Sequence, residues 1–143
     1  MDLDACRAAN LERIREYFNL IATGGVDALA QYWHNEIVFE APFSSTGKPS
    51  RTVGKQAVYD RLSTSYGLVS MAFHITAIYE LTDPDRFLVE YNSDGHMLGS
   101  GERYQNSYIT LVEMRDGLIS RFREFYDSQR CAAAFGPLLD SDH

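Results

Sequence analysis

Polar and apolar residues alternate along the last third of the chain, a pattern typical of β-strands. Residues 103–127 read as two long strands joined by a tight turn at residues 115–117, where an Asp-Gly pair interrupts the alternation. Strict alternation in the second strand places one set of side chains on a single face: Leu118, Ser120, Phe122, Glu124 and Tyr126. The carboxylate of Glu124 is thus predicted to lie between two aromatic side chains.

The first part of the chain has helical spacing instead. Apolar residues recur three and four positions apart over residues 3–22, which predicts an amphipathic helix ending at the Gly24-Gly25 pair. Further helices are predicted over residues 26–33 and 54–66, and a short strand over 36–40 ends before Pro42. Residues 43–53 have the composition of a loop.

Long strands follow the three predicted helices. Residues 69–81 and 86–97 are separated by a turn-forming Asp-Pro-Asp segment, and Gly-Ser-Gly at 99–101 precedes the two strands of the last third. Helices followed by hairpins predict an α+β fold with a curved sheet around the helices. With no linker or internal repeat, we expect one domain over residues 1–143.

Composition and charge exclude several classes of partner and of cellular location. A formal net charge of -7 argues against binding to a phosphate backbone, because nucleic-acid binding requires a basic patch. The two cysteines, Cys6 and Cys131, lack metal-ligand spacing, so we expect no metal site and reduced thiols. The acidic start of the chain predicts no secretion signal, and no apolar run is long enough for a membrane span. We therefore expect a cytoplasmic protein.

Glu124 is the first candidate for chemistry. Burying an ionised carboxylate among aromatic side chains is unfavourable, so the group is expected either to be paired or to have a raised pKa. A carboxyl group that titrates near neutral pH can serve as a general acid or base. The alternative is a structural ion pair with an arginine such as Arg103, and Glu90 is a second carboxylate that would share the face of Glu124.

The order of elements resembles the nuclear-transport-factor-2-like superfamily, which includes ketosteroid isomerases, SnoaL-like cyclases and phenazine-biosynthesis A/B proteins. Residues 16–43 are most similar to ketosteroid isomerases. Residues 83–90, 95–96, 104–106 and 116–125 are most similar to the phenazine A/B group. The resemblance implies a cone-shaped, mixed but mainly antiparallel sheet wrapped around three amino-terminal helices and enclosing an apolar cavity. It also implies a homodimer, expected through the sheet face that carries Arg121, Arg123 and Phe125.

Comparison with these families marks several positions. The isomerase base, an Asp before the loop proline, is replaced by Ala41, with Glu40 one residue earlier and expected to face the other way. Tyr17 matches the isomerase tyrosine that donates to the oxyanion. Glu124, in Arg-Glu-Phe, matches the acidic residue of the phenazine group, whose helical serine corresponds to Ser65 and whose histidine corresponds to Arg61.

Other residues complete the candidate site. His74 is a proton carrier if it faces the cavity. Tyr104, Asn106 and Tyr108 share one face, which is either a cavity wall or a dimer face, and Asn106 is the best hydrogen-bonding candidate. Asp94 and His96 lack a third metal ligand. Seven aromatic residues are expected to belong mainly to the core, with a subset lining an apolar pocket: Trp33, Phe39, Phe43, Tyr66, Phe73, Phe122 and Tyr126. Of these, Trp33, Phe43, Phe122 and Tyr126 are the candidates for substrate binding.

These observations predict a cofactor-free enzyme of secondary metabolism: a cyclase, isomerase or condensing enzyme that transfers protons in an apolar cavity. Glu124 would exchange the proton, Tyr17 or Asn106 would hold a carbonyl oxygen, and Arg61 would pair with a substrate carboxylate. The expected substrate is small and hydrophobic or aromatic. Two alternatives remain open, a ligand-binding or dimerisation module without catalysis and an epoxide hydrolase of the limonene type.

Overall fold

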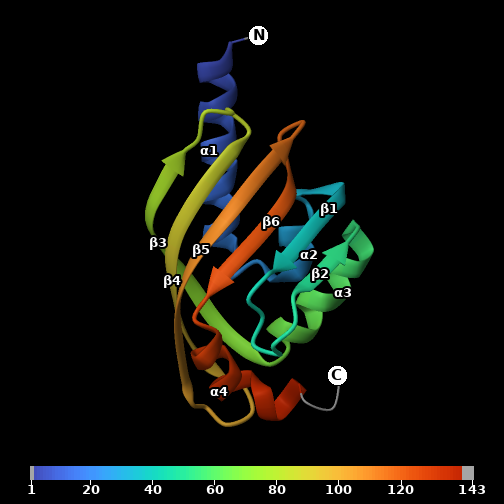
Figure 1. Cartoon of the computed structure of the whole chain (residues 1–143), viewed down its shortest axis with the longest axis vertical. Coiled ribbons are helices and arrows are strands. Elements are labelled where there is room, and N and C mark those ends of the chain that lie inside the picture. The colour runs from blue at the N-terminus through green and yellow to red at the C-terminus, as the bar shows by residue number, and fades with distance from the viewer. Residues whose placement is uncertain (1, 140–143) are drawn as a thin grey trace.

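The computed structural model describes residues 2–139, which form four helices and six strands. The elements in chain order are α1 (Leu3–Leu20), α2 (Gly25–Ala30), β1 (Trp33–Ala41), β2 (Ser50–Val53), α3 (Lys55–Tyr66), β3 (Val69–Glu80), β4 (Arg86–Met97), β5 (Arg103–Arg115), β6 (Leu118–Tyr126) and α4 (Ser128–Leu139) (Figure 1).

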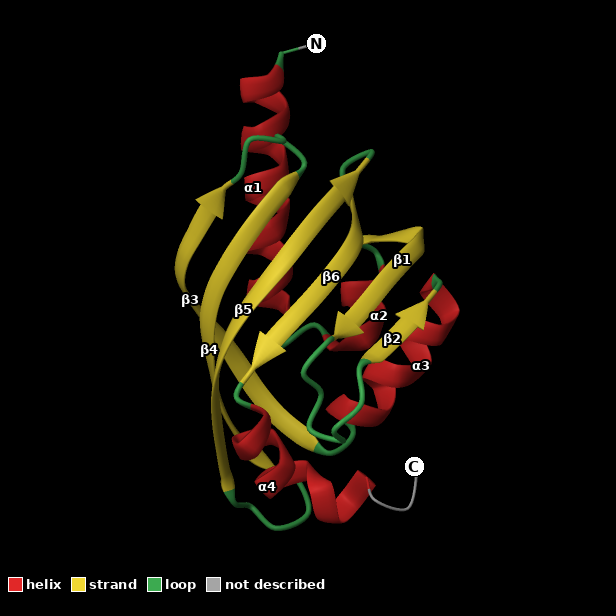
Figure 2. Cartoon of the chain, viewed as in Figure 1, coloured by secondary structure: helices red, strands yellow, loops and turns green. Residues whose placement is uncertain are grey.

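The strands form one curved, mixed sheet in the order β2-β1-β6-β5-β4-β3. Only the β1–β6 pair is parallel, and the other neighbours are antiparallel. Helices α1, α2 and α3 lie behind the sheet in Figure 2, while over the described residues the face toward the viewer has no helix across it. The predicted α+β fold, with amino-terminal helices inside a curved sheet, is confirmed.

The hydrophobic core lies between the sheet and the helices. Phe18 of α1 contacts Tyr91 of β4 edge to face, with ring centroids 4.7 Å apart, and Trp33 at the start of β1 is also fully buried. Among the described residues, no helix combines the length and the apolar character that crossing a membrane requires.

Three features of the fold differ from the sequence prediction. Residues 50–53, predicted as loop, form β2 along the edge of the sheet, and residues 128–139 form a helix that the pattern did not indicate. Strict alternation along residues 118–126 was wrong at its start. The register shifts between Glu113 and Met114 of β5, so Ile119 pairs with Met114 and is buried, while Ser120 is the extra residue of a bulge.

The predicted turn between β5 and β6 is confirmed. Asp116 and Gly117 have φ values of 55° and 76°, the left-handed conformation that a tight hairpin turn requires at both central residues. Beyond the bulge, Phe122, Glu124 and Tyr126 do share the inner face of β6, as the pattern predicts, because they pair with Val112, Thr110 and Tyr108 of β5.

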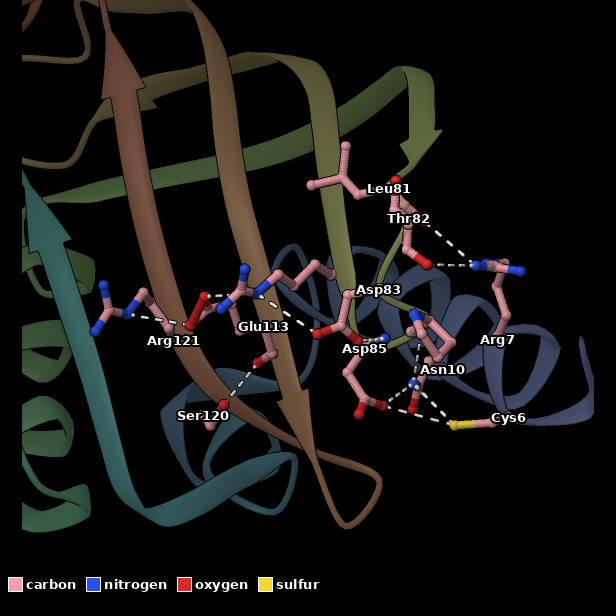
Figure 3. A network of polar contacts seen from close by, with 12 residues as sticks. Cys6, Arg7, Asn10, Leu81, Thr82, Asp83, Asp85, Glu113, Ser120 and Arg121 are labelled. Atoms are coloured by element: carbon pink, nitrogen blue, oxygen red, sulfur yellow. Dashed lines mark hydrogen bonds and ion pairs between the residues drawn. The ribbon is translucent and has the colours of Figure 1, made fainter. Parts of the chain in front are cut away.

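A polar contact fixes α1 to the turn between β3 and β4 (Figure 3). Asn10 is buried, and its Nδ2 donates to the Asp85 carboxylate at 3.0 Å and to the Pro84 carbonyl oxygen at 3.2 Å. Arg7 donates to the carbonyl oxygens of Leu81 and Thr82, each at 3.3 Å. The same turn is also bonded to β5, because Met114 N donates to the Asp85 carbonyl oxygen at 2.8 Å. One amide side chain thus joins the helical layer to the sheet.

Replacing Asn10 with Ala is expected to lower the free energy of unfolding by about 1–3 kcal/mol, because the substitution leaves two partly buried acceptors, one of them a carboxylate, without their donor. Gln56→Ala is the matched control, since Gln56 makes an exposed side-chain hydrogen bond to Asp60, and a change within about 0.5 kcal/mol is expected there. Denaturant titration measures both. Equal effects of the two substitutions would contradict this role of Asn10.

Candidate active site

A cavity of about 790 Å³ lies on the inner face of the sheet. Its walls come from α3, from the inner faces of β3, β5 and β6, from the first turns of α4, and from the loop before β2. Aromatic side chains form much of the lining: Phe39, Tyr66, Phe73, Tyr104, Tyr108, Tyr126 and Phe135.

Glu124 lies in the wall of this cavity. The side chain is partly exposed, and this exposure is to the cavity. Loss of water around the carboxylate raises its pKa from 4.5 to about 7, although the hydrogen bond from Tyr91 and the charge of Arg61 oppose the increase. The carboxyl group is therefore divided between its charged and neutral forms near neutral pH.

Tyr91 of β4 holds this carboxylate from behind. Its hydroxyl donates to Glu124 Oε2 at 3.1 Å and also lies 2.6 Å from the Thr110 Oγ1 atom. Both Tyr91 and Thr110 are almost fully buried. The Tyr91 ring stacks on that of Tyr108, with centroids 4.7 Å apart and an interplanar angle of 6°. A rigid support of this kind fixes the orientation of the carboxylate.

Arg61 faces Glu124 from α3. Its Nη1 donates to the Ser50 hydroxyl and, at 3.4 Å, to the Thr52 hydroxyl, and its guanidinium lies 5.8 Å from the centroid of the Phe39 ring. Ser65, one turn further along α3, also lines the cavity. The structure therefore brings Arg61, Ser65 and Glu124 into one cavity, together with Tyr108 and Tyr126.

Three predicted site residues lie in the core instead. Tyr17 and Trp33 are bonded to each other, with Trp33 Nε1 donating to the Tyr17 hydroxyl at 3.1 Å. Phe122 stacks on Phe39 with centroids 5.2 Å apart. All three are buried, and none is among the described residues that line the cavity. Burial raises the pKa of the Tyr17 hydroxyl well above its usual range, and the helix position that resembles an isomerase oxyanion donor has a packing role here.

Glu40, His74 and Phe43 lie away from the cavity. Glu40 faces the outer side of the sheet, as strand alternation predicts, where Arg121 and Arg123 approach its carboxylate at 3.4 Å. His74 is exposed because it has the outward parity of β3, opposite to its cavity-lining neighbour Phe73. Phe43 is 68% exposed and contacts Phe125 at 5.5 Å between centroids.

Asn106 points inward, but both of its side-chain N–H donors are used. Nδ2 donates to the Tyr104 hydroxyl at 2.9 Å and to the Asp127 carbonyl oxygen at 3.0 Å, and Oδ1 accepts from Ser107 N at 2.8 Å. An amide with these partners has no donor left for the carbonyl oxygen of a ligand. Asn106 therefore ties the end of β6 to β5 and holds the Tyr104 ring in the cavity wall.

Neither Arg103 nor Glu90, the two residues considered as neighbours of Glu124, contacts its carboxylate. Arg103 bonds Asp94, at 3.1 Å, rather than Glu124. Glu90 has the outward parity of β4 and accepts from Tyr79 at 3.0 Å, so the inner position beside Glu124 belongs to Tyr91. Within residues 2–139, no three His, Cys, Asp or Glu side chains are grouped in a way that could hold a metal ion.

Sequence reasoning missed several residues of the site. Tyr91 was assigned no role, and Tyr66 and Phe73 were predicted only as aromatic residues of which a subset would line the pocket, although the alternation of β3 and β4 contained the information for Phe73 and Tyr91. Cys131 and Phe135 line the cavity from α4. Because the helix itself was not predicted, no sequence signal pointed to this part of the lining.

The pKa of Glu124 makes stability depend on pH. The carboxyl binds a proton more tightly in the folded chain, with a pKa of about 7, than in the unfolded chain, near 4.5. Unfolding is therefore favoured as pH rises through this interval, by up to about 3 kcal/mol above pH 7. Glu124→Gln is expected to remove this loss of stability, whereas Glu12→Gln, at an exposed position of α1, should not. Denaturant titrations at pH 5 and pH 8 test the difference, and equal pH dependence in all three proteins would contradict it.

Replacing Tyr91 with Phe is expected to raise the pKa of Glu124 further, because the lost hydrogen bond favours the ionised form. The increase should be about one to two pH units. Tyr79→Phe is the matched control, since the Tyr79 hydroxyl bonds only the outward Glu90 among described residues. Carbon-detected NMR titration of the glutamate carboxyls measures the change. An unchanged Glu124 titration in Tyr91→Phe would show that this bond does not control the carboxyl.

Known proteins share this sequence pattern. A family model described as the SnoaL-like domain matches residues 14–122. The uncharacterised protein YesE of Bacillus subtilis is 29% identical over 126 residues, which cover 87% of this chain and 86% of that protein. An uncharacterised PhzA/B-like protein of Pseudomonas aeruginosa is 27% identical over 117 residues, which cover 82% of this chain and 83% of the relative.

Solved structures share the fold as well. A putative isomerase from Bacillus subtilis is similar with a TM-score of 0.83 and 28% identity, over 95% of this chain and 96% of the other. A phenazine biosynthesis-related protein from Pseudomonas aeruginosa has the same fold, with a TM-score of 0.82 and 24% identity, over 94% of this chain and 90% of the other. The superfamily resemblance predicted from sequence is confirmed. Because the family match extends from α1 into β6 and so includes most of the sheet, the chain belongs to the SnoaL-like domain family.

Proposed function

We propose that this protein is an enzyme that moves a proton on a small ring-containing substrate, as an isomerase, cyclase or condensing enzyme does. The observation that carries the proposal is the position of Glu124, whose carboxyl lies in the wall of a cavity rich in aromatic side chains and has a pKa of about 7. A group with this pKa has both a proton acceptor and a proton donor form at neutral pH.

The two oxygens of the Glu124 carboxylate have different surroundings. Oε2 accepts from Tyr91, whereas Oε1 has no hydrogen-bond partner among the described residues. Oε1 is thus the atom that would exchange a proton with a bound substrate. The Tyr91 bond would hold the carboxylate in one orientation while this happens.

A second group could support the developing charge on a carbonyl oxygen. The side chain of Tyr66 lines the cavity at the end of α3, and its hydroxyl makes no hydrogen bond to the described residues. Loss of water raises the pKa of Tyr66 well above its usual range, so the hydroxyl keeps its proton at neutral pH. We assign to Tyr66 the donor role that the sequence suggested for Tyr17 or Asn106, whose hydrogen-bonding groups have partners inside the protein.

This chemistry agrees with the name of one relative, the putative isomerase of Bacillus subtilis. An epoxide hydrolase of the limonene type would need an Asp-Arg-Asp arrangement around a water. Among the described residues of the cavity lining, Glu124 is the single carboxylate, so the lining supports proton transfer at carbon better than hydrolysis.

The homodimer stays a prediction. The outer face of β5 and β6, on which Arg121, Arg123 and Phe125 lie, carries the exposed Ile109, and the exposed Phe43 from the loop after β1 contacts Phe125 there. In Figure 1 this face is turned toward the viewer without a helix over it. These features support pairing between two copies through the sheet.

Proton transfer can be tested without knowing the natural substrate. The protein is expected to speed the exchange of deuterium into the C1 position of 2-tetralone, a ring ketone with acidic protons beside its carbonyl, with a rate that rises as pH increases through about 7. Glu124→Gln should lower the rate by roughly a hundredfold or more, and Tyr66→Phe should lower it as well. Proton NMR measures the exchange.

Tyr79→Phe is the control and should exchange at the wild-type rate. Equal rates in wild type and Glu124→Gln would contradict the proposal. If a panel of ring ketones exchanges no faster with the protein than in buffer, a ligand-binding protein without catalysis becomes the better description.

A further inference from the structure

The charges in the cavity lining differ in sign from those of the whole chain. The protein has a formal net charge of -7. In contrast, the charged side chains among the described lining residues are two cations, Lys48 and Arg61, and one carboxylate, Glu124. Because Glu124 is neutral in part at pH 7, the cavity has a net positive charge. A positive cavity in an acidic protein favours an anionic ligand over a cationic one.

Arg61 has the geometry to bind this anion. Its hydrogen bonds to the described residues involve Nη1 alone, which donates to the hydroxyls of Ser50 and Thr52. An arginine has five N–H donors, and within residues 2–139 Arg61 has no ion pair with a carboxylate, unlike Arg121 and Arg123. The contacts to the two hydroxyls and to the Phe39 ring fix the guanidinium plane. The free donors can therefore form the paired contacts that a planar carboxylate accepts.

The remaining lining restricts the rest of the ligand. Tyr108 and Tyr126 lie on the adjacent strands β5 and β6, and Phe73 of the edge strand β3 has its ring centroid 5.2 Å from that of Tyr108. Such surfaces bind flat apolar rings. A ligand with its charged group at Arg61 and its ring against these side chains would lie beside Glu124.

We propose that the cavity binds a planar ring carboxylate with its carboxylate at Arg61, and that binding of this anion transfers a proton from solvent to Glu124. The inference rests on the proposed function in one respect, since it assigns Glu124 as the group that carries the proton. It adds the substrate class and the protonation state in which the complex begins.

The coupling follows from the charges around Glu124. The positive charge of Arg61 opposes the increase in the pKa of Glu124, and a bound carboxylate would neutralise that charge. The other titratable groups near Glu124 come from α1, α3, β4, β5, β6 and α4, and they are Tyr17, Tyr66, Tyr91, Tyr104, Tyr108, Tyr126 and Cys131. Each has a raised pKa, so these groups stay neutral between pH 6 and pH 8 and cannot replace Arg61. Lys48, the second cation of the lining, is exposed on the loop before β2, and Arg61 is the cation whose charge lowers the pKa of Glu124.

The coupling is reciprocal. If the anion favours the protonated form of Glu124, then protonation of Glu124 increases the affinity for the anion by the same factor. Affinity must therefore fall as pH rises through about 7, because deprotonation places a second negative charge beside the bound carboxylate. In the complex Glu124 is the neutral acid, and it is ready to donate its proton to the substrate.

Calorimetric titration with 2-naphthoate, a flat ring carboxylate, tests this inference against 2-naphthamide, a neutral compound of the same shape. Wild type is expected to bind the carboxylate roughly tenfold to a hundredfold more tightly than the amide at pH 6. The preference should shrink by up to roughly tenfold at pH 8. Titrations at pH 7 in buffers of different ionisation enthalpy should show net uptake of protons with naphthoate and none with naphthamide.

Two variants separate the parts of the inference. Arg61→Gln should bind both compounds equally, while Glu124→Gln should prefer naphthoate at both pH values and take up no proton. Equal affinity of wild type for both compounds, or naphthoate binding without proton uptake, would overturn the inference. Since these titrations involve no turnover, they are independent of the exchange assay. If Glu124→Gln loses exchange but wild type shows no preference for naphthoate, this inference fails and the proposed function stands. If wild type binds naphthoate with proton uptake but Glu124→Gln exchanges at the wild-type rate, the proposed function fails and the coupled binding stands.

Discussion

The transfer of one carboxylate from water into an aromatic wall is the constraint on which the site depends. Loss of hydration alone would keep Glu124 neutral over most of the physiological pH range. The Tyr91 hydroxyl and the Arg61 guanidinium each recover part of the lost hydration energy of the ion, and together they bring the pKa to about 7. The chemistry of the cavity is thus set by a balance between one unfavourable and two favourable contributions. A change at any of these three side chains alters that balance without altering the fold.

The sheet allows this balance of contributions to the pKa of Glu124 because its two faces carry different kinds of side chain. On the outer face, carboxylates and arginines meet as ion pairs, as Glu40 does with Arg121 and Arg123. On the inner face, Glu124 lies one residue from Arg123 yet contacts a tyrosine instead of that arginine. The alternation of a β-strand therefore decides which carboxylate is paired and which remains available to a ligand.

Much of this arrangement was predictable from the sequence. The long strands, their turn and the inward position of Glu124 follow from alternation, which is reliable where one face is buried and the other wet. The bulge at Ser120 was not predictable, because an inserted residue reverses the parity before it while leaving the composition unchanged. Tyr17 and Asn106 were misplaced for a different reason. Their residue types suit an oxyanion donor, but their partners, Trp33 and the Asp127 carbonyl, come close only in the folded chain.

The short chain of groups from Glu124 through Tyr91 to Thr110 accommodates both charge states of the carboxyl. When Glu124 is ionised, Tyr91 donates to it and Thr110 can donate to Tyr91. When Glu124 is protonated at Oε1, Oε2 can still accept from Tyr91 as a carbonyl oxygen, although the bond is weaker than the one to the carboxylate. No heavy atom has to move when the proton is gained or lost, and no buried hydroxyl loses its partner. The protein can therefore gain or lose the proton with little reorganisation of its own structure, which leaves the energy of the step to be set by the substrate.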